Sequence, residues 1–286
     1  MYGSEVWGAS LKDDFGYWDK HSIEKTHLHF CKTFLGVNKK ASNIGCRAEM
    51  GRFPFTIDID TRILKYWIHL DSLGDNNVVK QAFIMSKTLN DTGHKSFHSH
   101  IRGLLDKMGR PKSDILYPSK FNIRTGIKQL QDKYITIWRE KLENSEKLRF
   151  YSEIKSNYEY ENYLESVENI SFRKELTKLR ISNHNLLIER GRYCSPKLPR
   201  EERLCSFCSE CKLEDEKHFL LDCQFYNEDR NSLKLWPLVI KYIDFNKLDL
   251  TQKLEILFKN SDPEFSAVFS KHVFTCMKKR NDYTSS

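Results

Sequence analysis

The sequence predicts a mostly α-helical protein, built as an irregular assembly of several helices. Apolar residues recur at three- and four-residue spacing along most of the chain, which is the period of an amphipathic helix. Glycine (12) and proline (7) are scarce among the 286 residues, whereas turn-dense β-proteins need many of both. The hydrophobic share of 39% and the aromatic share of 13% exclude a disordered chain.

Four segments have the clearest helical stripes. Their apolar positions are Ile23, His27, Phe30, Phe34 and Val37 in the first; Ile59, Ile63, Tyr66 or Trp67, and Leu70 in the second; Ile127, Leu130, Tyr134, Ile137 or Trp138, and Leu142 in the third; and Phe265, Val268, Phe269, Val273 and Cys276 in the last. The last helix also has a start signal, because Asp262 is a preferred N-cap residue and Pro263 suits the first helical position.

Composition divides the chain into three regions. Residues 1–73 are helical and aromatic. Residues 74–168 form a polar helical linker region with breaks at Gly93, at 109–111 and at 117–118, and its charged stretch 151–163 is a candidate linker. Residues 169–286 contain a basic helix, a group of cysteine and histidine residues, and the terminal helices.

The charge balance and the apolar runs limit the compartment and the partners. The net charge is +8, which is compatible with a nucleic-acid partner. No apolar run approaches the roughly 20 residues that cross a bilayer, and the N-terminus has no signal-peptide pattern. We therefore expect no membrane partner and an intracellular location, in the cytoplasm or the nucleus. Thiols are reduced there, so the eight cysteines favour a metal site over disulfides.

The spacing of cysteine and histidine over residues 205–223 indicates a metal site. Cys205, Cys208, His218 and Cys223 follow the pattern C-x2-C-x9-H-x4-C. A Cys-x-x-Cys turn brings two sulfur atoms to one point, and the second pair completes a tetrahedral set. Four protein ligands leave no open position. We therefore predict a structural Zn²⁺ ion in a small C-terminal CCHC zinc knuckle.

Cys211 leaves an alternative ligand set open. Cys208 and Cys211 form a second Cys-x-x-Cys pair. We predict Cys205 and Cys208 as ligands, with Cys211 as a spare thiol. Reduced cysteines that pack as small apolar side chains are the other alternative, but four cysteines and a histidine within 19 residues argue against it.

The segment between the two ligand pairs predicts a short helix. Residues 214–216, Glu-Asp-Glu, suit its first turn, where the helix dipole favours acidic side chains. His218 lies within this helix. Residues five apart do not share a face of an α-helix, so Cys223 is expected to act from its frayed C-terminal end.

Residues 171–203 form a basic segment that we predict as a helix. It has nine lysine and arginine residues against four glutamates, a net charge of +5 within 33 residues. A solvated helix face is the usual reason for such a run, but next to a metal module we predict contact with RNA or DNA. The residues expected at the phosphates are Arg173, Lys174, Lys178, Arg180, Arg190, Arg192 and Arg200. Tyr193 is expected to stack on an unpaired base, and Phe207 is a second aromatic residue near these cations.

Several short blocks follow the pattern of one known family. The blocks are residues 2–8 (YGSEVWG), 23–37 (IEKTHLHFCK with LGV), Asn43 with 49–54 (EMGRFP), 172–203 (with IERGRY and PREER), and the cysteines and histidine with 215–223 (DEKHFLLDC). They resemble the region after the polymerase core in LINE-type (non-LTR) retrotransposon reverse transcriptases. The similarity covers about residues 1–70 and 171–230.

The resemblance implies a thumb or connector region over 1–73 and a zinc-knuckle tail. In the family, that tail helps to hold the element's RNA or target DNA during target-primed reverse transcription. The aromatic-x-Asp-Asp hairpin that binds the catalytic metal ions is missing from this sequence, which has only Asp13-Asp14 after Leu11-Lys12. We therefore expect a detached C-terminal piece that is not an enzyme.

Two functions from different classes remain open. The first is binding of RNA or DNA by the basic segment and the zinc knuckle. The second is a zinc-stapled helical scaffold for protein–protein interaction, with the missing polymerase core as the partner. Exposed apolar residues within 1–73 would favour the second function.

Overall fold

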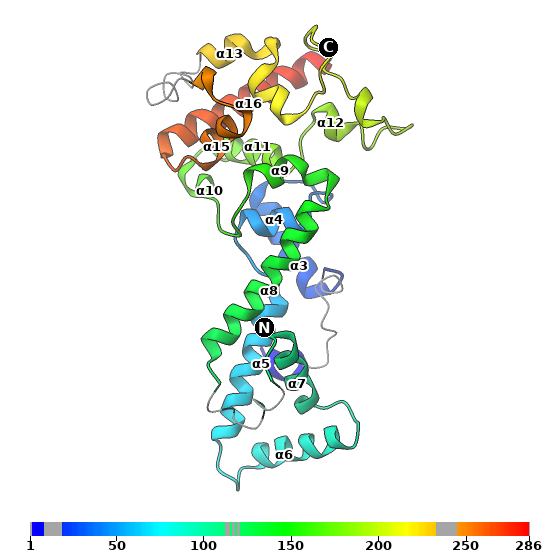
Figure 1. Cartoon of the computed structure of the whole chain (residues 1–286), viewed down its shortest axis with the longest axis vertical. Coiled ribbons are helices and arrows are strands. Elements are labelled where there is room, and N and C mark those ends of the chain that lie inside the picture. Colours follow the sequence, from blue (N-terminus) through cyan, green and yellow to red (C-terminus); the bar gives the residue numbers. More distant parts are fainter. Residues whose placement is uncertain are drawn as a thin grey trace. The chain divides into compact units, whose positions relative to one another are not determined.

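The computed structural model of the chain is mostly helical, as the sequence predicts (Figure 1). The structure describes residues 2–8, 19–111, 115, 118, 121–232 and 245–285. These residues contain no β-strand, only isolated bridges that join Met50 to Tyr160 and Leu204 to Leu213. Within the same residues, no helix is long and apolar enough to cross a membrane.

The chain divides into two compact units that combine distant parts of the sequence. Unit 1 contains Met1–His27 and Phe53–Glu140, and unit 2 contains Leu28–Arg52 and Lys141–Ser286. These borders differ from those predicted at 73 and 168. The reason is long-range packing: in unit 2 the Glu161 amide donates to the Glu49 carbonyl at 3.1 Å, so an N-terminal segment joins the C-terminal half.

Unit 1 is built around α5. Its helices are α1 (Ser4–Trp7), the first part of α3 (Ser22–Leu35), α5 (Phe55–Ser72), α6 (Val78–Asp91), α7 (Phe97–Lys107) and most of α8 (Ile123–Glu143). Helix α5 packs against α1, α6 and α7. The predicted stripe of α5 is confirmed, with Trp67 rather than Tyr66 buried, and the Trp67 ring meets Phe121 edge-on at 5.4 Å.

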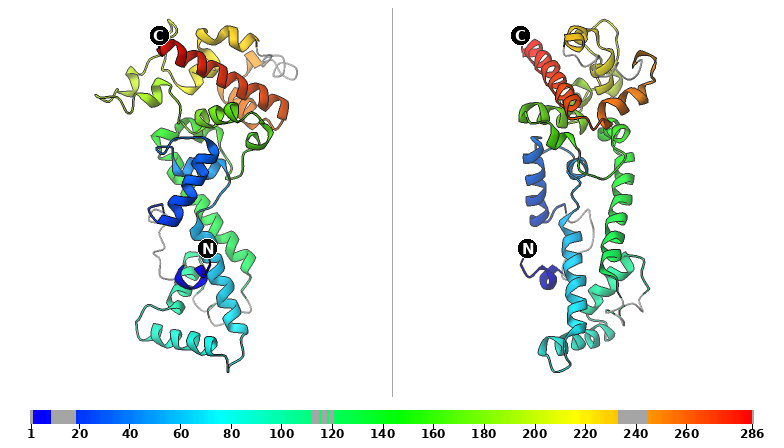
Figure 2. Two further views of the ribbon diagram at one scale, coloured as in Figure 1. Left: turned by 180° about the vertical axis from the view of Figure 1, so that it is seen from behind. Right: turned by 90° about the vertical axis from the view of Figure 1, so that its left-hand side faces the viewer.

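Unit 2 is built around the C-terminal helix. Its elements are the rest of α3, α4 (Asn43–Glu49), η4 (Glu146–Leu148), α9 (Arg149–Ile154), α10 (Tyr163–Ser166), α11 (Ile170–Arg180), α12 (Leu187–Arg190), η5 (Arg200–Glu202), η6 (His218–Asp222), η7 (Gln224–Tyr226), α13 (Asn227–Ser232), η8 (Phe245–Lys247), α15 (Leu250–Lys259) and α16 (Pro263–Ser285). Helix α16, drawn in red in Figure 2, packs against α10, α11 and α13. Its start is as predicted, because the Asp262 carboxylate accepts from the Glu264 amide at 2.9 Å.

The stripe predicted for α3 is wrong in its second half. Phe30 is 50% exposed and Phe34 is 36% exposed. The buried positions there are Leu28, Cys31 and Leu35 instead. Both sets recur at helical spacing, so the period alone does not decide which stripe faces the core.

The stretch 151–163 is packed into unit 2 and is not a linker. Tyr151 and Tyr163 are buried. The Lys155 ammonium, also buried, donates to the Glu159 carbonyl at 2.6 Å and pairs with Glu161 at 2.5 Å. The many charges of this stretch misled the prediction, because several of them are satisfied inside the protein.

Candidate metal centre and basic surface

Four side chains converge at one point in unit 2, and they are the four that the spacing predicts. The ligand atoms of Cys205, Cys208, His218 and Cys223 all lie within 4.8 Å of one another. The Cys205 and Cys223 sulfurs are 3.8 Å apart, and the Cys208 sulfur is 3.3 Å from His218 Nε2. This Cys/His cluster is therefore compact enough to bind a metal ion.

A tight turn holds the first pair of cysteines. The Cys205 amide donates to the Lys212 carbonyl at 2.8 Å, and the Glu214 amide donates to the Arg203 carbonyl at 2.9 Å. These two hydrogen bonds close the segment between them into a loop that carries both Cys205 and Cys208. Local backbone pairing thus brings the two thiols together.

The second pair of ligands lies on η6, which is a π-helix. The Cys223 amide donates to the His218 carbonyl at 2.8 Å, a hydrogen bond between residues five apart. A π-helix makes such i→i+5 bonds, whereas an α-helix does not. The expected frayed α-helical end is replaced by one wider turn, which brings positions 218 and 223 to the same side.

Cys211 does not belong to the cluster. Its side chain is exposed, and its φ of 52° lies in the left-handed region. The Cys211 thiol lies 3.9 Å from the Ser209 carbonyl oxygen. The preference for Cys205 over Cys211 as partner of Cys208 is therefore consistent with the geometry.

The acidic residues beside the cluster have roles other than the predicted one. Asp215 accepts a hydrogen bond from the His218 amide at 2.9 Å, just before η6 begins. Glu214 and Glu216 are buried. Glu214 accepts two hydrogen bonds from the Arg280 guanidinium, at 2.5 and 2.9 Å. The Glu216 Oε1 atom lies 2.9 Å from His184 Nε2. Burial raises the pKa of Glu216, but the hydrogen bond and charge of His184, together with hydrogen bonds from a backbone amide and the Ser182 hydroxyl, lower it below its usual value.

The thiols of the cluster differ in acidity. The hydrogen bond from the Cys223 thiol lowers the pKa of Cys205 to about 5. The same hydrogen bond, together with burial, raises the pKa of Cys223, and burial raises that of Cys208. Without a cation the site therefore favours one thiolate, and a bound cation would supply the charge that further thiolates need.

Phe207 is part of the packing around the cluster. Its ring lies 5.2 Å from that of Phe225 and 5.5 Å from that of Tyr283. The Arg280 guanidinium lies 5.2 Å from the ring centroid. The Phe207 ring is therefore already in contact with two aromatic rings and one guanidinium group inside unit 2.

The basic segment is not one helix. Helix α11 ends at Arg180, and Ser182 has a φ of 51° in the left-handed region, where a helix does not continue. The rest forms the short helix α12, irregular chain and η5. The predicted cations are consequently spread over different surfaces.

Arg180 has to be removed from the set expected at phosphates. Its side chain is 1% exposed. The guanidinium pairs with Glu49 at 2.6 Å and with Glu161 at 2.8 Å. Those two carboxylates raise its pKa despite burial. Arg180 therefore ties α11 to α4 inside unit 2 and is shielded from a ligand.

The other predicted cations of α11 are half-buried. Lys178 pairs with Glu175 at 2.9 Å. Arg173 donates to the Leu164 carbonyl at 3.2 Å, and its guanidinium lies 5.6 Å from the ring centroid of Phe34. The hydrocarbon stem of Lys174 lies close against Gly36.

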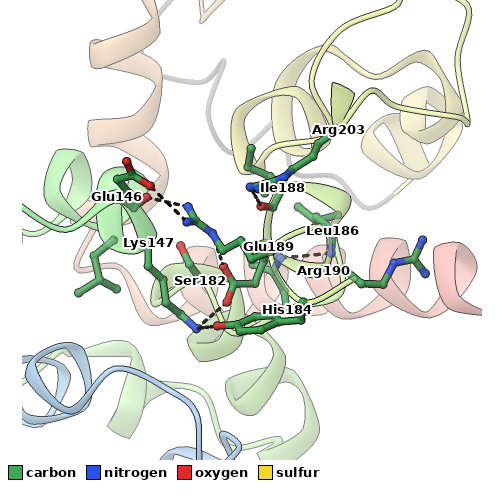
Figure 3. Close-up of polar contacts among 12 residues, drawn as sticks. Glu146, Lys147, Ser182, His184, Leu186, Ile188, Glu189, Arg190 and Arg203 are labelled. Carbon is green, nitrogen blue, oxygen red and sulfur yellow. Dashed lines mark hydrogen bonds and ion pairs between the residues drawn. The ribbon is translucent and has the colours of Figure 1, made fainter. Parts of the chain in front are cut away.

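Arg190 and Arg192 differ in their surroundings (Figure 3). Arg190 is exposed, and Figure 3 shows its side chain directed away from Glu189 and Lys147. Arg192 pairs with Glu189 at 3.0 Å and donates to the Glu146 carbonyl at 2.8 Å. Arg192 thus holds a loop in place, whereas Arg190 is available to a ligand.

Tyr193 lies between two lysines that the sequence did not indicate. The residue is 56% exposed. The ammonium groups of Lys40 and Lys147 lie 5.4 and 5.5 Å from the ring centroid, and Lys147 also donates to the phenol oxygen at 3.1 Å. We call these three residues the stacking surface. No local signal marks the two lysines, because both are distant from Tyr193 in the sequence.

A second aromatic pair is exposed on the part of α3 that belongs to unit 2. The Phe30 and Phe34 rings lie 6.3 Å apart and are stacked. The Arg52 guanidinium lies 5.7 Å from the Phe30 centroid, and Arg173 flanks Phe34. Exposed aromatic rings with adjacent guanidinium groups also suit base stacking.

Arg200 is half-buried in η5 and lines a cavity described below. Asp13-Asp14 lies outside the residues that the structure describes.

No family model matches the sequence, and no curated protein or solved structure matches the chain.

Proposed function

We propose that unit 2 binds single-stranded RNA or DNA, with one base stacked on Tyr193 and phosphates near Lys40 and Arg190. The stacking surface is the observation that carries this proposal. An exposed aromatic ring stacks on any base, and adjacent ammonium groups attract the strand's phosphates. The rings of Phe30 and Phe34, with their flanking arginines, offer a second place for a base.

We also propose that the metal of the Cys/His cluster is zinc. Three thiols and one imidazole are a donor set that Zn²⁺ prefers in structural sites. With Zn–S bonds of about 2.3 Å, tetrahedral geometry separates two ligand sulfurs by about 3.8 Å. The distance between Cys205 and Cys223 fits that value at 3.8 Å. Zinc bound there would fix the loop and η6 as a CCHC knuckle.

The resemblance of the sequence to LINE-type reverse transcriptases supports the same function. In that family the corresponding tail contacts nucleic acid and carries no polymerase site. We therefore propose that this chain is a non-catalytic, nucleic-acid-binding piece of such an element. The support is the set of sequence blocks given above, together with the convergence of the four predicted ligands.

Binding of a fluorescent single-stranded RNA across a salt series tests the proposal. Tyr193→Ala should weaken binding about tenfold, because a base–aromatic stack contributes about 1–3 kcal/mol. Tyr193→Phe keeps the ring and should retain most of the affinity. Arg190→Glu should make the log–log salt slope less steep by about 1–2.

Lys259→Glu is the matched control for the charge change, because Lys259 is on α15, away from Tyr193 in the sequence, and pairs with Glu255 at 2.8 Å. It should leave the salt slope as in the wild type. Arg192 is unsuitable for charge reversal, since it holds Glu146 and Glu189. Absence of binding at low salt, or binding that Tyr193→Ala does not weaken, would reject the proposal.

A protein-binding scaffold is the second candidate function, and α6 in unit 1 favours it. None of its residues is buried. Val78, Val79, Ile84, Met85 and Leu89 are exposed large apolar residues of this helix, and Met85 is 67% exposed. Exposed apolar residues grouped on one helix are typical of a protein interface.

Capture of a purified LINE-type polymerase core tests this second function. The wild-type chain should retain the core, and Met85→Glu should abolish retention by placing a charge on the apolar surface. Lys87→Glu changes an exposed position of the same helix and should leave retention intact. No retention by the wild type would reject the scaffold function.

A further inference from the structure

A cavity of about 370 Å³ in unit 2 has walls made mostly of cationic side chains. Its charged lining residues are Glu146, Arg149, Arg192, Lys197, Arg200 and Arg203. Positive charge therefore dominates the lining, and the carboxylate of Glu146 is largely exposed to solvent. We call this space the cationic cavity.

Arg203 contributes a buried positive charge to the wall. Its side chain is 4% exposed. The guanidinium donates to the Leu198 carbonyl at 3.0 and 2.7 Å and to the Ile188 carbonyl at 2.9 Å. Carbonyl groups orient a guanidinium without neutralising it. Burial, followed by the nearby charges of Arg192 and Arg200, lowers the pKa of Arg203, and the carboxylates of Glu189 and Glu201 offset this only in part, so the cations of this wall repel one another.

Ion pairs compensate only part of this charge. Arg192 is paired, with Glu189 at 3.0 Å and with Glu146 at 3.8 Å. The other four cations of the cavity have no ion pair among the residues that the structure describes. The space therefore has an excess of donors and positive charge, which an anion would satisfy.

The cavity is linked to the stacking surface by a short chain of contacts. Lys147, which donates to Tyr193, also pairs with Glu189 at 2.5 Å. Glu189 in turn holds Arg192 on the cavity wall. A ligand that carries both a base and a phosphate can therefore engage two sites that share one network.

We propose that the cationic cavity is a phosphate-binding pocket. The planar fork of arginine matches two phosphate oxygens, and several cations at one place suit a group with two or more charges. One phosphate fills only part of the space, which leaves room for the attached sugar. This rests on the proposed function, because a nucleic-acid strand would supply the phosphate, as an internal diester or as a terminal monoester.

Inorganic pyrophosphate tests the pocket without a nucleic acid. Calorimetric titration of the zinc-loaded full chain should show saturable binding. Arg200→Gln and Lys197→Gln should each weaken it about tenfold, since each removes a charged donor. Lys259→Gln removes a charge elsewhere in unit 2 and should leave the affinity unchanged. No binding, or equal binding by all variants, would overturn the pocket.

Two oligonucleotides, with a 5′-phosphate or a 5′-hydroxyl, distinguish the sources of the phosphate. A larger loss for the phosphorylated strand in Arg200→Gln assigns the pocket to a terminal monoester, and equal losses assign it to an internal diester. Pyrophosphate binding that depends on Arg200, without any RNA binding, retains the pocket and rejects the proposed function. RNA binding that depends on Tyr193 but not on Arg200 or Lys197 rejects the pocket alone.

Discussion

The Cys223 amide donates to the His218 carbonyl at 2.8 Å, and this single i→i+5 hydrogen bond brings two cluster residues to the same side of η6. In an α-helix, positions five apart point in different directions, so the C-x2-C-x9-H-x4-C pattern needs this wider turn. π-helical turns are rare and often occur at functional sites. The spacing of the four residues and the local backbone geometry therefore depend on each other.

Removal of one ligand should abolish metal binding, whereas removal of the spare thiol should not. We expect Cys205→Ser to reduce zinc from about one equivalent to almost none and to destabilise the region around residues 203–225 by more than about 2 kcal/mol. Metal content of the purified chain and thermal unfolding measure both effects. Cys211→Ser is the control and should keep zinc. Full zinc retention by Cys205→Ser would assign the site to Cys208 and Cys211 instead.

The buried pair of Glu214 and Arg280 should contribute much more to stability than an exposed pair. Glu214 also accepts from the Leu187 amide at 2.7 Å, so it connects the cluster to α12 and α16. We expect Glu214→Gln to cost about 3 kcal/mol, because the Arg280 charge would remain buried without its partner. Chemical denaturation measures the loss.

Glu255→Gln on α15 is the matched control for that measurement. Glu255 pairs with Lys259 at 2.8 Å, and both side chains are exposed. Exposed i,i+4 pairs contribute only about 0.3–0.5 kcal/mol. Similar losses in Glu214→Gln and Glu255→Gln would contradict a structural role for the buried pair.

The four cluster residues could be predicted from the sequence because their spacing is a local property. Helices α5, α8 and α16 were predictable for the same reason, since one apolar stripe describes each of them and α16 also begins at the predicted Asp262 cap. The π-helical turn was not predictable, because no residue pattern marks its i→i+5 hydrogen bond. That bond goes together with His218 and Cys223 facing the same point as Cys205 and Cys208.

The sequence could not predict which of the basic side chains are buried and which are exposed. Arg180 is buried because Glu49, 131 residues away, accepts its hydrogen bond. Charge clustering along the chain says nothing of such a partner. Tyr193 was indicated by its basic neighbours, but Lys40 and Lys147 approach it from distant segments. Phe30 and Phe34 were expected in the core because two alternative stripes on α3 have the same period.

Gly51 should be intolerant of any side chain. Its φ is 56°, and a Cβ atom there would lie 2.6 Å from the Tyr160 backbone nitrogen. We expect Gly51→Ala to destabilise the chain by more than about 1 kcal/mol, through strain and through separation of these two segments. Gly103→Ala in α7 has open space around its Cβ and should stabilise by about 0.5–1 kcal/mol. Urea denaturation of both variants gives the comparison, and equal stability of Gly51→Ala and the wild type would contradict the close approach.

His272 on α16 should make the stability of unit 2 depend on pH. Its side chain is buried beside Cys276, with the Sγ atom 3.7 Å from Nδ1. Burial, followed by the nearby charge of Arg230, lowers the pKa of His272 from 6.5 to about 4. Between these two values the unfolded chain binds a proton that the folded chain does not. Stability therefore falls as the pH is lowered from 6.5 towards 4, by up to about 3 kcal/mol.

His272→Asn should remove this part of the pH dependence, because the amide has no proton to gain. The free energy of unfolding, measured by urea denaturation at a series of pH values, should fall less steeply in the variant than in the wild type over that window. Acid also protonates the Cys/His cluster, but that contribution is common to both chains and cancels in their difference. His29→Asn, at an exposed position of α3, should keep the wild-type slope. Parallel pH profiles for His272→Asn and the wild type would show that His272 ionises freely inside the folded protein, in conflict with its burial beside Arg230 of α13.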